Sequence, residues 1–362
     1  MSSFPTPPAL KGRGTPVRIA HRFERADREA FDDGWGTVEQ QAVEEVLPPE
    51  TTVIDERVKS LIARNDSPDI PFELSINPYR GCEHGCVYCY ARPTHSYLNL
   101  SPGLDFETRI VAKVNAAERL ADELARPSYQ PSPINVGSAT DAYQPVERRL
   151  RITRAVLEVL QRCRHPYTIV TKSSGVERDV DLVAAAAARG QAWVSISITT
   201  LESSLARILE PRAAAPHRRL ETVRRLSAAG VPVGVNVAPI IPFINEPEIE
   251  RIIEAAAQAG ASSIHYTVLR LPWEVDPLFQ EWLGRHFPDR AARVMAHVRE
   301  MHGGRDYRAE FGKRMKGEGP WAQLVRQRVH KAAQRCGVAG QAPALDVSAF
   351  APPRKGRQQE LF

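Results

Sequence analysis

Three stretches of this sequence share one order: a helix-period segment, a glycine, and then a short apolar run rich in β-branched residues. A glycine directly after the last helical residue is typical of a helix end, because that position favours a left-handed backbone. Helices that alternate with short apolar strands predict βα units and a parallel sheet. The three units are Asp179–Arg189 with Gly190 and Trp193–Ile198, His217–Ala229 with Gly230 and Val231–Ala238, and Glu248–Ala259 with Gly260 and Ser263–Leu269.

Three more apolar runs precede these units, so we expect about six βα repeats in all. The additional strands are Phe72–Ile76, Ile134–Gly137 and Tyr167–Thr171, with helices expected over Glu107–Ala125 and Glu147–Cys163. The expected fold class is therefore α/β, with the repeats arranged as a (β/α)6 partial barrel. In such barrels the working residues lie at the carboxyl ends of the strands.

The composition is that of a sizeable globular protein without a dominant charge. Its 362 residues are 43% hydrophobic, and 48 basic against 43 acidic residues give a net charge of +5, which permits nucleic acid binding without requiring it. No apolar run has the length of a membrane span, and the first residues lack the apolar stretch of a secretory signal. We expect no membrane partner and a cytoplasmic location, where five cysteines stay reduced.

Three of the five cysteines fall within eight positions, in the stretch GCEHGCVYCYARPTHSY. Cys82, Cys86 and Cys89 are spaced C-x3-C-x2-C, so one short loop can place three thiolates around an iron–sulfur cubane. A 4Fe-4S cluster normally takes four protein thiolates, whereas Cys163 and Cys336 lie far along the chain. This pattern predicts a three-ligand 4Fe-4S cluster whose fourth iron is open to the amino and carboxylate groups of S-adenosylmethionine.

Two other interpretations of the cysteines remain open at this point. A structural zinc site would usually carry a second C-x2-C pair, so here its fourth ligand would be His84 or His95. The three cysteines could also be buried thiols without a ligand.

The motif, with the aromatic Tyr88 before its last cysteine, resembles that of the radical S-adenosylmethionine (radical SAM) superfamily. Within that superfamily, the text SINPYRGCEHGCVYCYARPTHSY is similar to the spore photoproduct lyase-like branch, also labelled DNA repair photolyase-like. The resemblance covers about residues 65 to 300 and is specific for the superfamily rather than for a substrate. It implies a radical SAM partial barrel, a 4Fe-4S cluster and S-adenosylmethionine as cofactors, an external electron donor, and a 5′-deoxyadenosyl radical.

The resemblance also implies cofactor-binding residues at the strand ends. The branch uses a hydroxyl residue after the second strand, a lysine after the third and a serine on the fourth, and these positions correspond to Thr140, Lys172 and Ser195. Ser197 is the alternative to Ser195 on the fourth strand. Lys172 is also the cation that the residues themselves suggest for the carboxylate of S-adenosylmethionine.

Tyrosines flank the last cysteine of the motif, and the resemblance implies that Tyr88 and Tyr90 are catalytic, as a hydrogen-atom relay. Tyr88 could alternatively only pack near the adenine. One departure concerns the hydrogen-donating cysteine of the lyases, which is Ser138 here. A serine O–H bond is too strong to replace that thiol, so we expect a substrate other than the spore thymine dimer.

The segments outside the barrel are expected to be less regular. Residues 1–65 are interpreted as an irregular arm, with a short helix over Thr51–Asn65, and residues 66–275 as the barrel. Residues 276–340 form a basic extension, helical over Pro277–Met301, which either contacts nucleic acid or covers the barrel with an amphipathic helix. The basic residues of the arm are Lys11, Arg13, Arg18, His21, Arg22, Arg25 and Arg28, and phosphate contact is one reading of them.

Residues 341–362 are interpreted as a flexible tail that ends in QQELF. This end resembles the pentapeptide that binds the bacterial sliding clamp, in which Gln358, Leu361 and Phe362 would enter an apolar pocket.

The sequence therefore predicts a radical SAM enzyme that abstracts hydrogen from an unknown substrate, for which we expect a nucleic acid base in DNA repair or modification. The alternative is a DNA-associated scaffold or redox sensor with a non-catalytic cluster, recruited by the clamp.

Overall fold

The main sheet has seven strands in the order β10-β9-β8-β7-β6-β3-β2. In the computed structural model, which describes residues 10–24 and 50–353, six of them run parallel, and only the edge strand β2 (Ala63–Arg64) is antiparallel. The parallel strands are β3 (Leu74–Ile76), β6 (Ile134–Val136), β7 (Tyr167–Thr171), β8 (Ala192–Ser197), β9 (Val233–Ile240) and β10 (Ser263–Val268). These are the six predicted strands, and the partial barrel is confirmed.

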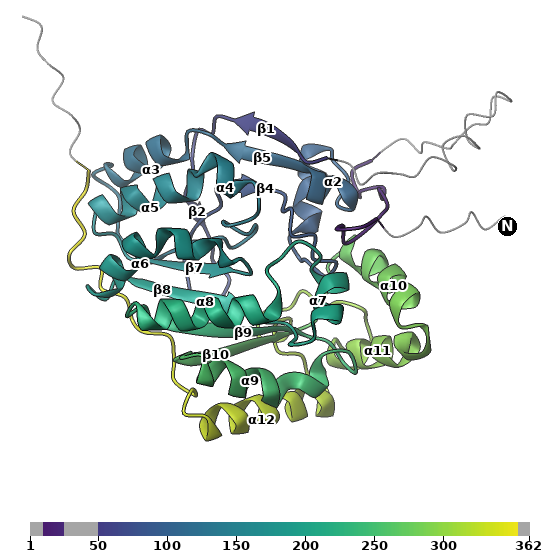
Figure 1. The fold of residues 1–362 in the computed structure, drawn as a ribbon. Helices are drawn as coiled ribbons and strands as arrows, with labels where there is room; N and C mark the ends of the chain where they lie inside the picture. The colour runs from purple at the N-terminus through teal and green to yellow at the C-terminus, as the bar shows by residue number, and fades with distance from the viewer. Residues whose placement is uncertain (1–9, 25–49, 354–362) are drawn as a thin grey trace, which may run out of the picture.

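Helices connect the strands and cover one side of the sheet (Figure 1). Gly190, Gly230 and Gly260 all adopt positive φ angles directly after a helix, as predicted. The expected helix over Glu147–Cys163 is interrupted at Arg151 (φ +53°). The connecting helices are α3 (Ala116–Leu124), α4 (Glu147–Leu150), α5 (Ile152–Arg162), η2 (Ser174–Asp179), α6 (Val180–Ala187), α7 (Ser203–Leu209), α8 (Pro216–Ala228), η3 (Glu246–Glu248) and α9 (Ile249–Gln258).

A second, three-stranded sheet corrects two of the helix predictions. Thr51–Asn65 is not a helix but contains β1 (Thr52–Glu56) and β2, and the range Glu107–Ala125 is divided by β5 (Arg109–Lys113). The sheet has the order β1-β5-β4, with β4 at Tyr79–Arg80. Strands β1 and β5 pair across 57 residues of sequence, and this long-range pairing overrides a local pattern that also suited a helix.

The cysteine loop lies at the carboxyl ends of the barrel strands. We call this end of the barrel its mouth. The chain runs from β4 through the cysteines into η1 (Arg92–Leu98) and α2 (Leu104–Thr108). Residues 10–24 are irregular but packed against this loop, with the Val17 carbonyl accepting from the Leu104 N–H at 3.0 Å. Figure 1 shows this segment in purple beside α2 and α10 (Val275–His286). Arg25 and Arg28 lie outside the described residues.

The basic carboxyl-terminal extension covers the barrel. It contains α10, α11 (Pro288–Met301) and α12 (Gly319–Arg335), which packs on α9. Most of its charges are paired within the protein: Arg314 contacts Asp69 at 2.7 Å and Arg335 contacts Glu254 at 2.5 Å. These pairs support the covering-helix interpretation of this region over the nucleic acid interpretation.

Residues 341–353, the first part of the predicted flexible tail, lie along the amino-terminal ends of the strands, which we call the floor of the barrel. The Asp346 N–H donates to the Gly190 carbonyl and the Ala351 N–H to the Cys163 carbonyl, both at 2.9 Å. The QQELF end lies outside the described residues. No helix in the described part of the chain is long and apolar enough to cross a membrane.

One buried histidine on this floor makes stability depend on pH. His165 contacts the Pro166 carbonyl through Nδ1 (2.9 Å) and the Tyr129 hydroxyl through Nε2 (2.7 Å), and its ring packs edge-on against Phe350. Burial lowers the pKa of His165 to about 4. Between pH 6.5 and 4 the unfolded chain therefore binds a proton that the folded chain does not.

We predict that lowering the pH from 7 to 5 removes about 2 kcal/mol from the free energy of unfolding through His165. His165→Asn, whose side-chain amide offers an N–H donor but does not titrate, should unfold with a shallower pH dependence over this range. Urea denaturation at a series of pH values measures both slopes, and equal slopes in the parent and the variant would contradict the prediction.

Candidate active site

The cysteine loop is held by a buried ion pair. Arg92 and Glu107 are both fully buried, with 2.5 Å between Nη2 and Oε1. Arg92 also donates through Nε to the Cys86 carbonyl at 2.9 Å, and Glu107 accepts from the Gly14 N–H at 2.9 Å. The same ion pair therefore fixes the loop, α2 and the amino-terminal segment against one another.

Backbone geometry in the loop requires glycine at one position. Gly85 lies between the first two cysteines with φ +67°, and a Cβ there would stand 2.7 Å from the Glu107 carboxylate. Both the left-handed backbone and the close approach exclude a larger residue. The loop can thus wrap tightly enough to bring its cysteines to one place.

The three thiols are neighbours and almost enclosed. Cys82 and Cys86 are buried, and Cys89 is partly exposed. Burial raises the pKa of the Cys82 thiol, and the negative charges of Asp141, Cys86 and Cys89 raise that pKa further. Three thiolates this close need a positive centre, which an iron cluster supplies.

The arrangement does not suit a single zinc ion. Within the described residues, no group of three or more histidine, cysteine or acidic side chains is close enough to hold one metal ion. The two histidines considered as a fourth ligand are engaged elsewhere, since His84 lies 3.3 Å from Asp141 and His95 contacts the Arg109 carbonyl at 3.0 Å. Neither histidine is therefore free to complete a tetrahedral zinc site with the three cysteines.

Asp141 links the cysteine loop to two barrel strands. Its carboxylate faces His84, and it accepts from the Thr171 hydroxyl and the Lys172 N–H, both at 2.7 Å. Burial raises the pKa of Asp141, but the His84 charge and these hydrogen bonds outweigh that effect and lower it to about 2. The ionised carboxylate thereby fixes the end of β7, from which the Lys172 side chain projects.

The predicted cofactor residues lie on neighbouring strands. Val170 on β7 pairs with Ser195 on β8, and Lys172 follows directly after the last residue of β7. The Ser195 hydroxyl is fully buried and has no hydrogen-bond partner. Thr140 lies in the loop after β6, where the Asn77 side chain accepts from its N–H at 3.3 Å.

The interior face of the sheet carries further buried polar atoms without partners. In the strand register, Asn135 and Trp193 lie in one row across the sheet. Ser195 and Ser263 lie in another row, two residues farther along β8. The unpartnered atoms in this region are Asn135 Oδ1, Trp193 Nε1, Ser195 Oγ, Ser263 Oγ and His265 Nε2. Buried polar groups require hydrogen bonds, so this face fits a polar bound molecule or ordered water.

The two predicted tyrosines have different environments. The Tyr88 ring is buried, its hydroxyl donates to Glu210, and Lys172 Nζ stands 5.8 Å from its ring centroid. Tyr90 is half exposed at the mouth, and its hydroxyl donates to the Ser138 carbonyl. The structure thus places both beside the cysteines but brings only Tyr88 next to Lys172.

Sequence reasoning did not identify Asp141, Asn77, Arg92 or Glu107, and it left the role of Glu210 open. Glu210 forms a buried ion pair with Arg219 and accepts from the Thr199 hydroxyl at 2.6 Å. Burial raises the pKa of Glu210, but the Arg219 charge outweighs it and, with Lys172, lowers that pKa to about 2. Glu210 is therefore a structural anion that orients the Tyr88 hydroxyl.

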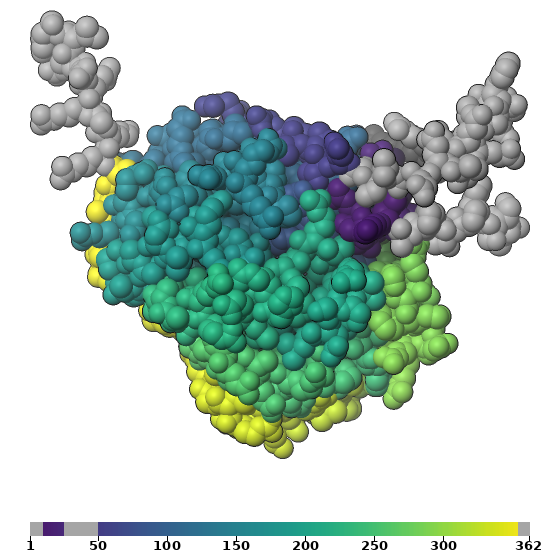
Figure 2. All heavy atoms as spheres, in the orientation of Figure 1, coloured from purple at the N-terminus to yellow at the C-terminus, as the bar shows by residue number. Residues whose placement is uncertain are grey.

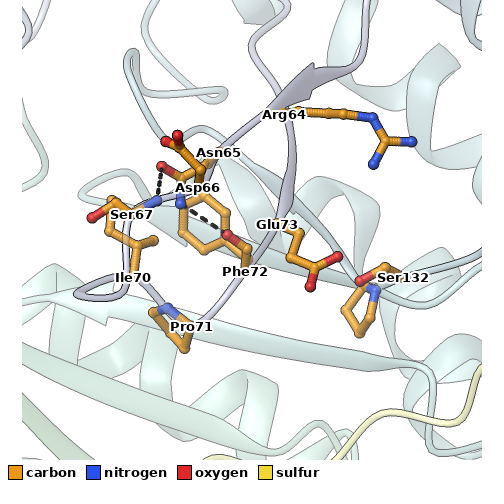
Figure 3. Close-up of a pocket in the computed structure, with 10 residues that line it drawn as sticks. Arg64, Asn65, Asp66, Ser67, Ile70, Pro71, Phe72, Glu73 and Ser132 are labelled. Carbon is orange, nitrogen blue, oxygen red and sulfur yellow. Dashed lines mark hydrogen bonds between the residues drawn. The ribbon is translucent and has the colours of Figure 1, made fainter.

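A hollow of about 860 Å³ lies away from these groups, where β3 and β6 begin (Figure 3). It is at the floor of the barrel, at the opposite ends of the strands from the cysteines, so it is not the candidate active site. Its lining residues are Arg64, Asn65, Asp66, Ser67, Ile70, Pro71, Phe72, Glu73, Ser132 and Pro133.

Comparison with known proteins identifies related sequences and folds. Residues 76–256 match the model of the radical SAM superfamily. An uncharacterised protein of Mycobacterium tuberculosis is 35% identical over 226 residues, which span 62% of this chain and 66% of that protein, just under two thirds of its length. An uncharacterised protein of Methanocaldococcus jannaschii is 29% identical over 173 residues, 48% of this chain and 62% of that protein.

The fold is similar to that of solved structures of spore photoproduct lyase. One of them, a variant with bound AdoMet and dinucleoside spore photoproduct, has a TM-score of 0.57 and 17% identity and covers 81% of this chain and 82% of its own. At this identity the similarity concerns the fold, and it agrees with the partial barrel described above.

We predict that Glu210→Gln destabilises the protein by about 3–5 kcal/mol, because Arg219 would keep a buried charge without its partner. Chemical denaturation under anaerobic conditions measures the loss. The double variant Glu210→Met, Arg219→Met removes both charges and should be more stable than the single variant. A single variant as stable as the parent would contradict the buried ion pair.

Proposed function

Because the chain belongs to the radical SAM superfamily, we propose that it abstracts a hydrogen atom from a nucleic acid base held at the barrel mouth. It is an enzyme whose cofactors are a 4Fe-4S cluster and S-adenosylmethionine. When bound, these cofactors supply a 5′-deoxyadenosyl radical by reductive cleavage of the sulfonium. Radical formation from S-adenosylmethionine follows from membership in the superfamily, whereas the identity of the substrate is our proposal.

The observation that carries the proposal is the convergence of three thiols beside an unpaired lysine. Cys82, Cys86 and Cys89 would bind three irons of the cluster. Within the described part of the chain the Lys172 ammonium group makes no hydrogen bond or ion pair, so it is available to a carboxylate. Thr140 and the unpartnered Ser195 hydroxyl would bind other polar groups of S-adenosylmethionine.

Three observations support a nucleic acid base as the substrate. The spore photoproduct lyase of similar fold binds a dinucleoside lesion. The chain has a net charge of +5, and half-exposed Tyr90 offers an aromatic ring at the mouth. The sequence resemblance puts Ser138 in the place of the lyases' donor cysteine, and its hydroxyl lies 3.0 Å from Asn77 Nδ2. A serine cannot replace a thiol as hydrogen donor, so we propose a reaction other than thymine dimer repair.

The cellular setting completes the proposal. All five cysteines are free thiols, which suits the reducing cytoplasm. The external electron donor and the sliding clamp, bound through Gln358, Leu361 and Phe362, remain predictions. Membership in an enzyme superfamily favours catalysis over the alternative of a clamp-recruited scaffold with a non-catalytic cluster.

Anaerobic reconstitution tests the chemistry directly. We predict that the protein loaded with iron and sulfide, reduced and given S-adenosylmethionine, forms 5′-deoxyadenosine, detected by chromatography. Cys86→Ala should lose the cluster absorbance and the product together, while Cys336→Ala, a cysteine distant in the sequence, should keep both. A fully loaded and reduced parent that forms no product would refute radical catalysis and leave the scaffold.

A second variant tests the assignment of Lys172. We predict that Lys172→Ala binds S-adenosylmethionine about 10- to 100-fold more weakly, because a charge-assisted hydrogen bond is lost. Its iron content should equal that of the parent. Equilibrium dialysis and iron analysis measure these quantities, with exposed Lys331→Ala as the control. Normal affinity in Lys172→Ala would remove this lysine from the cofactor site.

A further inference from the structure

Three large aromatic side chains lie exposed together near the mouth of the barrel. Phe23, Tyr97 and Trp273 are 49%, 69% and 63% exposed. They come from the amino-terminal segment, from η1 after the cysteines, and from the chain after β10, respectively. We call these three residues the aromatic platform.

Arg22 joins the three rings. Its guanidinium carbon stands 4.7 Å from the ring centroid of Phe23, 5.3 Å from that of Tyr97 and 4.4 Å from that of Trp273. The same guanidinium contacts both carboxylate oxygens of Glu274, at 3.1 and 2.9 Å. Its charge is therefore balanced and its plane is fixed, and the platform is rigid before any partner arrives.

Burial does not explain this arrangement. Trp273 has a φ angle of +46°, a left-handed backbone that is unfavourable for a bulky side chain. Strain of this kind persists where the surrounding structure enforces it and is concentrated at functional sites. Here it holds an indole at the surface rather than in the core, as expected for a binding surface.

The platform is continuous with the candidate active site. The Ser96 hydroxyl lies 3.4 Å from the Glu274 carboxylate that holds Arg22. Three residues before Trp273, Arg270 places its guanidinium 5.1 Å from the ring centroid of Tyr90, which directly follows Cys89. In Figure 2 the purple amino-terminal segment fills the surface between the blue barrel edge and the light-green helices α10 and α11.

We propose that the aromatic platform stacks the unpaired bases of single-stranded nucleic acid beside the active site. The inference rests on the proposed function and names the form of its substrate. Flat aromatic rings stack on any base, and each stacked base adds to the affinity. Charge complementarity favours this occupant over an apolar peptide, because Lys11 in the same segment is exposed and Arg18, although paired with Asp105 at 2.9 Å, keeps 60% of its side chain exposed.

Fluorescence anisotropy with a fluorescein-labelled dT12 oligonucleotide tests the proposal on the full chain. We predict that Trp273→Ala and Tyr97→Ala each weaken binding about fivefold or more. Leu324→Ala, which removes another half-exposed apolar side chain from α12, should bind like the parent. A blunt duplex of the same sequence should bind more weakly than the single strand.

The outcomes separate this proposal from the proposed function. Formation of 5′-deoxyadenosine without oligonucleotide should be unchanged in both platform variants. A parent protein that forms no 5′-deoxyadenosine would refute the proposed radical SAM function and not the platform. Platform variants that bind the oligonucleotide like the parent, or a parent that does not bind it, would overturn the platform proposal. Hydroxyl-radical footprinting of Trp273 with and without residues 25–49 would then show whether that segment is the occupant.

Discussion

The ion pair of Arg92 with Glu107 is the interaction on which the rest of the candidate site depends. Burying two charges is unfavourable unless they are paired and hydrogen bonded, and here carbonyls of three other residues and one backbone N–H complete the arrangement. Because the partners come from the cysteine loop, α2 and the amino-terminal segment, any movement of one would leave a charge unsatisfied. The thiols are therefore placed by a network of the protein's own buried groups.

Local patterns in the sequence predicted structure well, whereas structure that depends on long-range pairing could not be predicted. The six strands and the glycines that end helices were predictable, because apolar runs and left-handed helix ends are local patterns. The small sheet was not predictable, because β1 and β5 are strands by virtue of their pairing with each other, which the local sequence does not show. Ile110 and Val111 carried a weak strand signal inside a range that also fitted a helix.

The same distinction applies to the site. The cysteines could be found from their spacing and Lys172 from its place after a strand. Asp141, Asn77 and Glu107 make contacts with residues 31, 62 and 93 positions away, respectively, which no local pattern reveals. The aromatic platform likewise joins three distant segments, and Arg22 looked like one basic residue among several in an irregular arm.

The segment that precedes α12 has a consequence for how a substrate reaches the interior. Gly312 and Arg314 contact Asp69 at one edge of the main sheet, while the Met315 carbonyl accepts from Val268 on β10 at the other edge. Through these contacts one segment connects the two edge regions of the incomplete barrel. A substrate that entered between these two edges would have to break the contacts, whereas entry at the end of the barrel, past Tyr90 and the cysteines, would leave them intact.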